Sequence, residues 1–284
     1  MPSGQGYFDL VKLIKKNNLH TVCQEANCPN IAECFGKRTA TFMILGDTCT
    51  RNCKYCNVAH GTTKPLDIDE PKRVARAVKD LGLKYVVLTS VTRDDLPDGG
   101  ASVFAKTIYE IRIINPDCRI ETLIPDLNGS NEALQIILDF RPDVLNHNIE
   151  VVRRLFPKAR PQGSYERSLG LLRAAKELTN GGAINGGYGA TKSGLMVGLG
   201  ETKEEIIQTM GDLCSVTDIF TLGQYLQPTK NHLPVIKYYT PEEFKEFKEI
   251  GERMGFKHVE SGPLVRSSYH AGEYGNIERA QNGI

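Results

Sequence analysis

Hydrophobic runs alternate along the chain with segments of amphipathic pattern. β-branched and apolar runs predict six strands, at residues 39–46, 85–90, 119–125, 143–150, 193–200 and 219–227. Apolar positions at helical spacing predict helices near 7–18, 71–81, 101–114, 130–139, 164–179, 202–215 and 241–254. Six strands, each followed by a helix, imply an α/β fold with a parallel sheet curled into an open or closed barrel.

Two details support these boundaries. Pro71 suits a first helical turn, and Thr202 with Glu205 forms a capping-box signature.

The segment 180–190 is rich in glycine and invites comparison with a phosphate-binding loop. Its glycines precede a strand instead of following one, and no G-K-[ST] motif is correctly placed. We therefore predict a flexible surface loop there.

Composition narrows the class of protein. The 284 residues are 40% hydrophobic and 24% charged, which is ordinary for a globular chain with one barrel-sized core. A net charge of +1 gives no broad attraction for nucleic acid or an anionic membrane. No apolar stretch reaches the length of a membrane span, and the N-terminal residues lack a signal core. We predict a cytoplasmic location without nucleic-acid or membrane partners; an organelle location with a removed transit segment stays open.

Six of the eight cysteines lie within residues 23–56 and form two groups of three. The first trio is Cys23, Cys28 and Cys34, spaced C-x4-C-x5-C; the second is Cys49, Cys53 and Cys56, spaced C-x3-C-x2-C. Zinc sites favour four ligands in two close pairs, so this spacing disfavours zinc knuckles without excluding them. A disulfide framework is disfavoured by the sparse cysteines. Two sets of three thiolates suit two iron–sulfur clusters, each with one coordination position left for another ligand.

These motifs resemble a known family. The second trio, with the aromatic Tyr55 inside it, resembles the signature of the radical S-adenosylmethionine (SAM) superfamily. The first trio and the terminal RSSYHA resemble one branch of it, the lipoyl synthase family, and so do five other segments: FMILGDTCTRNCKYC, VTRDDLPDGGA, LNHNIE, TKSGLMVGLGET and GQYLQPTKNHLPV. The resemblance runs from residue 21 to about 271. It implies a partial (β/α)6 TIM-type barrel over residues 39–258, an N-terminal cysteine-loop extension over 1–38, and a C-terminal closing segment over 259–284.

The resemblance also implies an activity. Such enzymes insert two sulfur atoms at carbons C6 and C8 of a protein-bound octanoyl-lysine. No side chain can remove hydrogen from an unactivated carbon, so a radical generated by a cofactor is required. The 4Fe-4S cluster on the second trio would bind SAM. A second 4Fe-4S cluster, on the first trio and Ser268, would supply sulfur. Without the family, Ser268 would be interpreted as a turn cap.

Further SAM contacts follow from the same resemblance. They are Tyr55, Gly99, Gly100, Asn148, Glu150 and Arg167. The glycines permit close backbone approach to the methionine amino group; alone they would mark a polar turn. Asn148 and Glu150 match ribose-binding positions in the related biotin synthase, although solvated strand ends often carry such residues. Arg167 suits a carboxylate, with a surface ion pair as the alternative. Arg266 and His270 are expected only to shape the terminal segment, and Cys118 and Cys214 to be small buried residues.

The implied partners are octanoylated carrier domains, either the E2 protein of a dehydrogenase complex or the glycine-cleavage H protein. A ferredoxin- or flavodoxin-type reductant and an iron–sulfur carrier that rebuilds the second cluster are implied as well. The basic segment 153–160 contains Arg153, Arg154, Lys158 and Arg160. It could dock an acidic carrier, or it could be a solvated helix face. Competing functions are another two-cluster radical enzyme, an electron carrier and a zinc-stabilised binding module.

Overall fold

The computed structural model describes residues 5–26, 28–36, 41–180, 189–269 and 271. Its eight strands form one sheet in chain order. The strands are β1 (His20–Thr21), β2 (Thr41–Ile44), β3 (Tyr85–Ser90), β4 (Arg119–Leu123), β5 (Val144–Asn146), β6 (Ala190–Val197), β7 (Ile219–Gln224) and β8 (His258–Gly262). β1 is antiparallel to β2, and every later pair is parallel. All six predicted strands are present.

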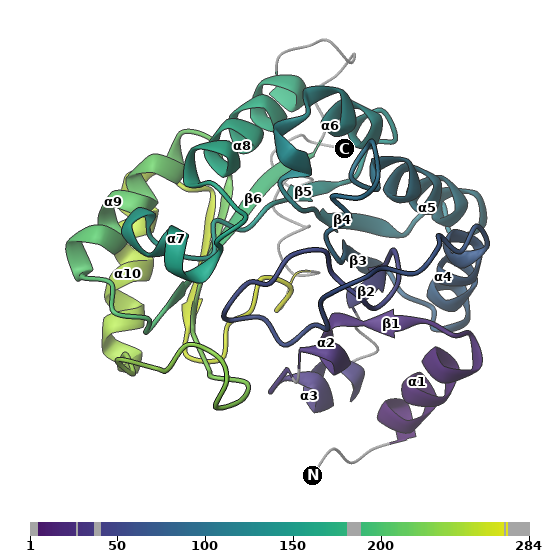
Figure 1. Cartoon of the computed structure of the whole chain (residues 1–284), viewed down its shortest axis with the longest axis horizontal. Helices are drawn as coiled ribbons and strands as arrows, with labels where there is room; N and C mark the ends of the chain where they lie inside the picture. Colours follow the sequence, from purple (N-terminus) through teal and green to yellow (C-terminus); the bar gives the residue numbers. More distant parts are fainter. Residues whose placement is uncertain (1–4, 27, 37–40, 181–188, 270, 272–284) are drawn as a thin grey trace.

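Helices follow the parallel strands and cover the outside of the sheet (Figure 1). They are α4 (Glu70–Asp80), α5 (Ala101–Ile114), α6 (Asn131–Leu138), α8 (Tyr165–Asn180), α9 (Lys203–Cys214) and α10 (Pro241–Met254). The capping box predicted at Thr202 and Glu205 is formed at the start of α9. A partial (β/α)6 barrel is confirmed. Short elements complete the described chain: α1 (Gln5–Lys16), α2 (Val22–Glu25), α3 (Ile31–Gly36), η1 (Leu127–Gly129), η2 (Arg153–Leu155) and α7 (Phe156–Ala159).

The structure differs from the sequence prediction at several boundaries. β1 and β8 add to the six predicted strands, one before residue 39 and one reaching past residue 258; the division into three domains stays a prediction. β5 ends at Asn146 and not near 150. Glu150 instead has φ +71° and forms an isolated bridge with Leu195. The glycine-rich loop was predicted over residues 180–190, but Asn180 ends α8 and Ala190 begins β6. Residues 181–188 of that loop and His270 lie outside the described residues.

A C-terminal segment lies inside the curved sheet, as the yellow trace at the centre of Figure 1 shows. Ala271 packs with Val87, Val144 and Ala190, whose side chains line the barrel interior. Gly223 of β7 makes room for this segment, because a Cβ there would lie 2.1 Å from the carbonyl oxygen of Val265. Residues 263–269 and Ala271 therefore lie against the inner face of the sheet. We call residues 263–269 the closing segment; the predicted role of residues 259–284 in closing the barrel stays a prediction.

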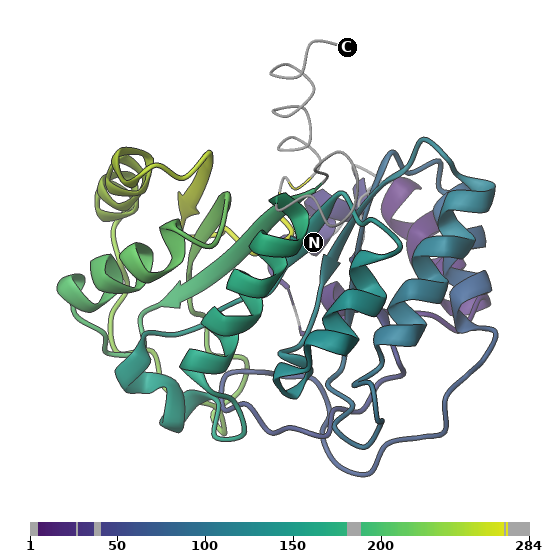
Figure 2. The same cartoon turned by 90° about the horizontal axis from the view of Figure 1, so that it is seen from above.

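The second cysteine trio lies at the carboxyl ends of the parallel strands. The long loop after β2, which contains the second cysteine trio, runs along the lower edge of the molecule in Figure 2. In α/β sheets the carboxyl ends of parallel strands are the usual location of active sites.

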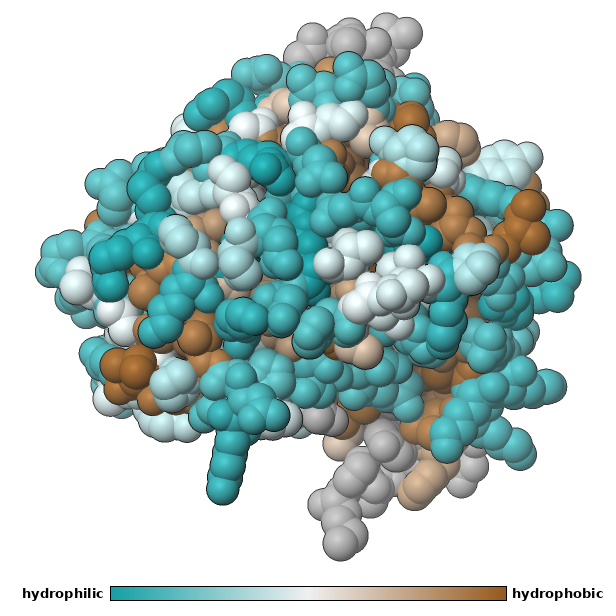
Figure 3. Space-filling view, viewed as in Figure 1, coloured by the Kyte–Doolittle hydropathy of each residue, from teal (hydrophilic) through white to brown (hydrophobic). Residues whose placement is uncertain are grey.

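Hydrophilic residues cover most of the face seen in Figure 3, and no described helix has the length and apolarity to cross a bilayer.

Gly223→Ala is expected to displace the closing segment, because the new methyl group would meet backbone and not a movable side chain. Overpacking of this kind costs about 1–3 kcal/mol of unfolding free energy. Chemical denaturation measures the loss, and faster hydrogen exchange in residues 263–269 locates it. Gly211→Ala in α9 is the control, since nothing lies within 4 Å of its added Cβ; equal behaviour of the two variants would contradict the prediction.

Candidate functional site

A sharp bend carries the chain from β2 into the second cysteine loop. Leu45 and Gly46 both have positive φ, +70° and +91°. Glu70, buried at the start of α4, accepts a 2.7 Å hydrogen bond from the Leu45 amide. Arg93 donates to the Leu45 carbonyl at 3.3 Å and pairs with Asp95. The bend therefore has fixed partners, and it directs the cysteines to the carboxyl ends of the strands.

Arg51, which lies between Cys49 and Cys53, anchors this loop. Its side chain is only 3% exposed. It pairs at 2.7 Å with Asp94, from the loop after β3, and at 2.7 Å with Asp126, which follows β4 and is fully buried. Asn128 accepts a further bond from Arg51 at 2.8 Å. A forked guanidinium can satisfy several acceptors in one plane, so one side chain joins three loops.

The second trio has surroundings suited to thiolate ligands. The sulfur of Cys49 accepts hydrogen bonds from the amides of Arg51 and Thr92, at 3.4 and 3.3 Å. Amide donors of this kind stabilise negative charge on cluster sulfurs. Burial raises the pKa of Cys53, and it raises the pKa of Cys56 to about 12. Iron must therefore displace protons when it binds here.

The first trio is carried by α2 and α3 at the edge of the sheet. Cys23 is buried, and its burial raises the thiol pKa to about 11. Cys28 and Cys34 are half-buried, and all six cysteines of the two trios are free thiols. No three His, Cys, Asp or Glu side chains within the described ranges are arranged to hold a metal ion. The thiols of both trios are suitable ligands for iron–sulfur clusters. Within the described residues, however, neither trio has its three sulfur atoms gathered into a metal-binding group.

The closing segment brings Ser268 to the first trio's neighbourhood. Asn30, between Cys28 and Cys34, donates to the Leu264 carbonyl at 2.7 Å. Tyr269 donates to Glu33 at 3.2 Å. Residues on both sides of Ser268 are thus bonded to the segment that carries the cysteines, although 230 or more positions separate them in the chain.

The two cysteine loops also touch each other. The Asn57 side-chain amide, directly after Cys56, donates to the Glu25 carbonyl at 3.0 Å. Glu25 ends α2, the helix that contains Cys23. The loops that carry the two trios are therefore in direct contact.

Gly99 and Gly100 precede α5 with φ of +61° and +91°. Asp98 accepts from the Gly100 amide at 2.9 Å and from the Ser102 amide at 2.8 Å. A Cβ at Gly100 would lie 2.3 Å from the Leu45 side chain. Glycine is required here by the left-handed backbone and by packing against the β2 bend, whether or not a ligand binds.

Asn148 and Glu150 follow β5 and are hydrogen-bonded to each other at 3.2 Å. Burial raises the pKa of Glu150, and the charge of Arg160 opposes that shift. Burial raises the pKa of Tyr55. The nearby charge of Glu150 raises it further, and the charge of Arg160 opposes the shift. The structure thus brings Tyr55, Asn148 and Glu150 together beside Cys53, and it adds Arg160, whose burial the sequence did not indicate.

Arg167 lies in the same region but has protein partners. It contacts Asp126 at 3.3 Å and Asn128 at 3.4 Å, and so belongs to the Arg51 network. Its assignment to the SAM carboxylate stays a prediction. Of the two remaining cysteines, Cys118 is buried as expected, whereas Cys214 is half-buried beside the core.

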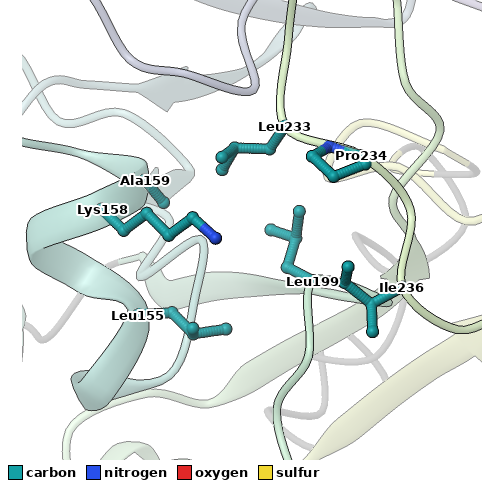
Figure 4. A pocket seen from close by; sticks show the side chains of 7 residues that line it. All are labelled: Leu155, Lys158, Ala159, Leu199, Leu233, Pro234 and Ile236. Carbon is teal, nitrogen blue, oxygen red and sulfur yellow. The ribbon is translucent and has the colours of Figure 1, made fainter.

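The basic segment 153–160 is mostly engaged within the chain. Arg153 pairs with Glu166 and Asp212, and Arg154 pairs with Glu205 at 2.6 Å. Arg160 is buried, and Lys158 is exposed. Lys158 extends into a shallow pocket (Figure 4), which is otherwise lined by Leu155, Ala159, Leu199, Leu233, Pro234 and Ile236. Of the four cations proposed to dock an acidic carrier, two are paired within the chain and Arg160 is buried, which leaves Lys158 for that role.

His147, beside Asn148, is a buried neutral group. Its Nδ1 lies 2.8 Å from the Ile124 carbonyl and its Nε2 lies 2.9 Å from the Ser168 hydroxyl. A carbonyl needs a donor, so Nδ1 carries the proton and Nε2 accepts. Burial, reinforced by the charge of Arg160, lowers the pKa of His147 to about 4.

Arg51→Met is expected to reduce the unfolding free energy by about 3 kcal/mol, because it leaves the buried Asp126 without its main cation. Denaturant unfolding of the cluster-free protein measures this loss. Lys64→Met, which breaks the exposed pair with Asp47, is the control and should cost less than about 1 kcal/mol. Similar losses in both variants would argue against an anchoring role.

A pH dependence follows from His147. Between pH 6.5 and about 4 the unfolded chain binds a proton at this residue and the folded chain does not, so stability falls as the pH falls. The full difference is about 3 kcal/mol. His147→Gln should flatten the plot of unfolding free energy against pH in this window. Parallel plots for the two proteins would contradict the prediction.

Comparisons with known proteins identify the family of this chain. Residues 43–213 match the family model of the Radical SAM superfamily. The lipoyl synthase of Rubrobacter xylanophilus is 57% identical over the whole chain and 86% of that protein. That of Caldanaerobacter subterraneus subsp. tengcongensis is 56% identical over 91% of this chain and 88% of that protein.

Two solved structures share the fold at low sequence identity. Methylornithine synthase has a TM-score of 0.55 at 14% identity, over 92% of this chain and 83% of that one. A maturase of the FeFe hydrogenase has a TM-score of 0.57 at 16% identity, over 95% and 67%. With the family model spanning most of the barrel, the chain belongs to the radical SAM superfamily, whose enzymes use SAM and a 4Fe-4S cluster, and within it to the lipoyl synthase family.

Proposed function

We propose that this enzyme inserts two sulfur atoms at C6 and C8 of an octanoyl group carried on a lysine of a protein domain, forming the lipoyl cofactor. The observation that carries the proposal is the contact between the closing segment and the segment that carries the first trio, through Asn30 with Leu264 and Glu33 with Tyr269. A structural zinc module or a simple electron carrier has no need for residues next to a serine at the far end of the chain to bond to its cysteine segment.

The second trio is proposed to hold the SAM-binding cluster. When bound, that cluster and SAM would supply the radical that removes hydrogen from an unactivated carbon. The chain's own part is to bind and orient SAM. We assign this to the backbone at Gly99 and Gly100 and to four side chains: Tyr55, Asn148, Glu150 and Arg167. The polar pair formed by Asn148 and Glu150 after β5 supports the assignment.

The first trio and Ser268 are proposed to hold a second 4Fe-4S cluster, which donates the sulfur. A hydroxyl oxygen is a harder ligand than a thiolate, so it should release a soft iron–sulfur centre more readily. The contact between Asn57 and Glu25 supports a short path between the two sites, because it joins the two ligand loops directly.

The proposed protein substrate is an octanoylated carrier domain, from a dehydrogenase E2 protein or the glycine-cleavage H protein. The exposed Lys158 beside an apolar pocket offers a docking point for an acidic domain. A ferredoxin- or flavodoxin-type reductant and an iron–sulfur carrier complete the proposed partners.

Replacing all three cysteines of the first trio by alanine is expected to halve the iron content. Anaerobically reconstituted wild-type protein should hold about eight irons per chain and the variant about four. The variant should still cleave SAM with dithionite, yet add no sulfur to an octanoyl-lysine peptide, as measured by mass spectrometry. A variant that keeps the full iron content, or still forms the dithiol, would refute the proposal.

Ser268→Ala isolates the hydroxyl ligand, and the adjacent Ser267→Ala is its matched control. We expect Ser268→Ala to lower dithiol formation roughly tenfold or more, as loss of a site-shaping ligand generally does. Ser267→Ala should behave as wild type. Equal effects of the two substitutions would remove the special role of Ser268.

A further inference from the structure

Arg160 lies where the cysteine loop meets the segment after β5. The carbonyl of Ala159, its neighbour, accepts a 2.8 Å hydrogen bond from the amide of Lys54, and the Lys54 carbonyl accepts from Leu233 at 3.0 Å. Lys54 stands between Cys53 and Tyr55 in the sequence. The backbone next to Arg160 is therefore joined to the middle of the second trio's loop.

The side chain of Arg160 is held inside the protein. The residue is 7% exposed, and its guanidinium carbon lies 5.2 Å from the centre of the Phe156 ring. Its Nη1 donates to the Asn148 carbonyl at 3.2 Å. Gly163 makes room for it, since a Cβ there would lie 3.3 Å from Nε. The backbone at Ala159 bonds to the cysteine loop and the Arg160 side chain bonds to Asn148, so residues 159 and 160 together connect that loop to the strand end that bears Asn148 and Glu150.

This cation interacts with carboxylates only at longer range among the described residues, and its Nε has no hydrogen-bond acceptor there. Burying a charge without a paired opposite charge is costly. The acidic groups near enough to interact electrostatically with Arg160 are Tyr55, Glu150, Cys53 and Asp126. Burial raises the pKa of Cys53 and of Glu150, and Arg160 opposes both shifts. No ion-pair contact within the described residues neutralises this guanidinium, although Glu150 and Asp126 act on it at longer range.

We propose that Arg160 is a positioning residue of the SAM site. Its fixed charge stabilises the negative charge of a thiolate-bound cluster on the second trio, and its bond to Asn148 holds the Asn148–Glu150 pair in place for SAM. The inference rests on the proposed assignment of Cys49, Cys53 and Cys56 to the SAM-binding cluster.

A consequence concerns the reduction potential of that cluster. A reduced cluster carries one more negative charge than an oxidised one, so a buried cation nearby favours reduction. Loss of the charge should move the potential to a more negative value. Loss of the Asn148 bond should weaken SAM binding without the same change in potential.

Arg160→Gln and Arg160→Lys separate these two effects in the reconstituted full-length enzyme. Arg160→Gln removes the charge and is too short to place a donor where Nη1 lies, whereas Arg160→Lys keeps the charge and loses the planar fork. We measure the midpoint potential of the cluster whose EPR signal responds to SAM, together with the dissociation constant for SAM. The glutamine variant should have the more negative potential, and the lysine variant should stay near wild type. Both should bind SAM roughly tenfold more weakly, as for other residues that orient ligands.

Arg154→Gln is the matched control, because it removes an equal charge from the same segment at an exposed position. It should change neither the potential nor SAM affinity. Equal potentials in Arg160→Gln and Arg160→Lys, or an equal shift in the control, would overturn the inference. A potential that follows the charge at residue 160 would uphold it even if no dithiol product formed, so its outcome is separate from that of the proposed function.

Discussion

The buried guanidinium of Arg51 is the interaction on which the candidate site depends. The loop between β2 and α4 contains no helix or strand, only an isolated bridge between Cys49 and His60. Arg51 ties that loop to Asp94 and Asp126, which stand at the ends of β3 and β4. Because those strands belong to one sheet, the barrel determines the orientation of the cysteine loop. This buried cation thus acts with the bonds of Leu45 to Glu70 and Arg93 to position the cysteine loop on the sheet.

The first trio is positioned by different means. Its helices are short and lie at the edge of the sheet, where β1 adds only two residues. Contacts from distant parts of the chain compensate: Leu264 and Tyr269 from the closing segment, and Asn57 from the second loop. The position of the first trio therefore depends on the closing segment, which lies near the other end of the sequence. Such an arrangement suits a sulfur-donating centre that is taken apart and rebuilt, which is the role proposed for it in this radical SAM sulfurtransferase.

The sequence predicted the repeating architecture because buried parallel strands are nearly continuous apolar runs and each is followed by an amphipathic helix. β8 was missed because its sequence, HVESG, is mostly polar, and its place is set by pairing with β7. Cysteine spacing indicated two sets of ligands. It could not indicate that the two loops touch, since Asn57 and Glu25 carry no local signal of their contact. Arg160 was grouped with surface cations for the same reason: a basic run does not reveal which of its members is buried.

The balance of charge around the second trio accounts for how such a site can accept its ligands. Arg51, Arg160 and Arg167 face Asp94, Asp126 and Glu150 there, so three cations stand against three carboxylates before anything binds. The neighbouring thiols keep their protons, because burial raises the pKa of Cys53 and Cys56. A thiolate-bound cluster adds negative charge, and SAM brings a positive sulfonium. Each ligand alone would leave a buried net charge, which is costly in a low dielectric. Bound together they offset each other, so the electrostatics of these residues favour SAM binding after the cluster is in place.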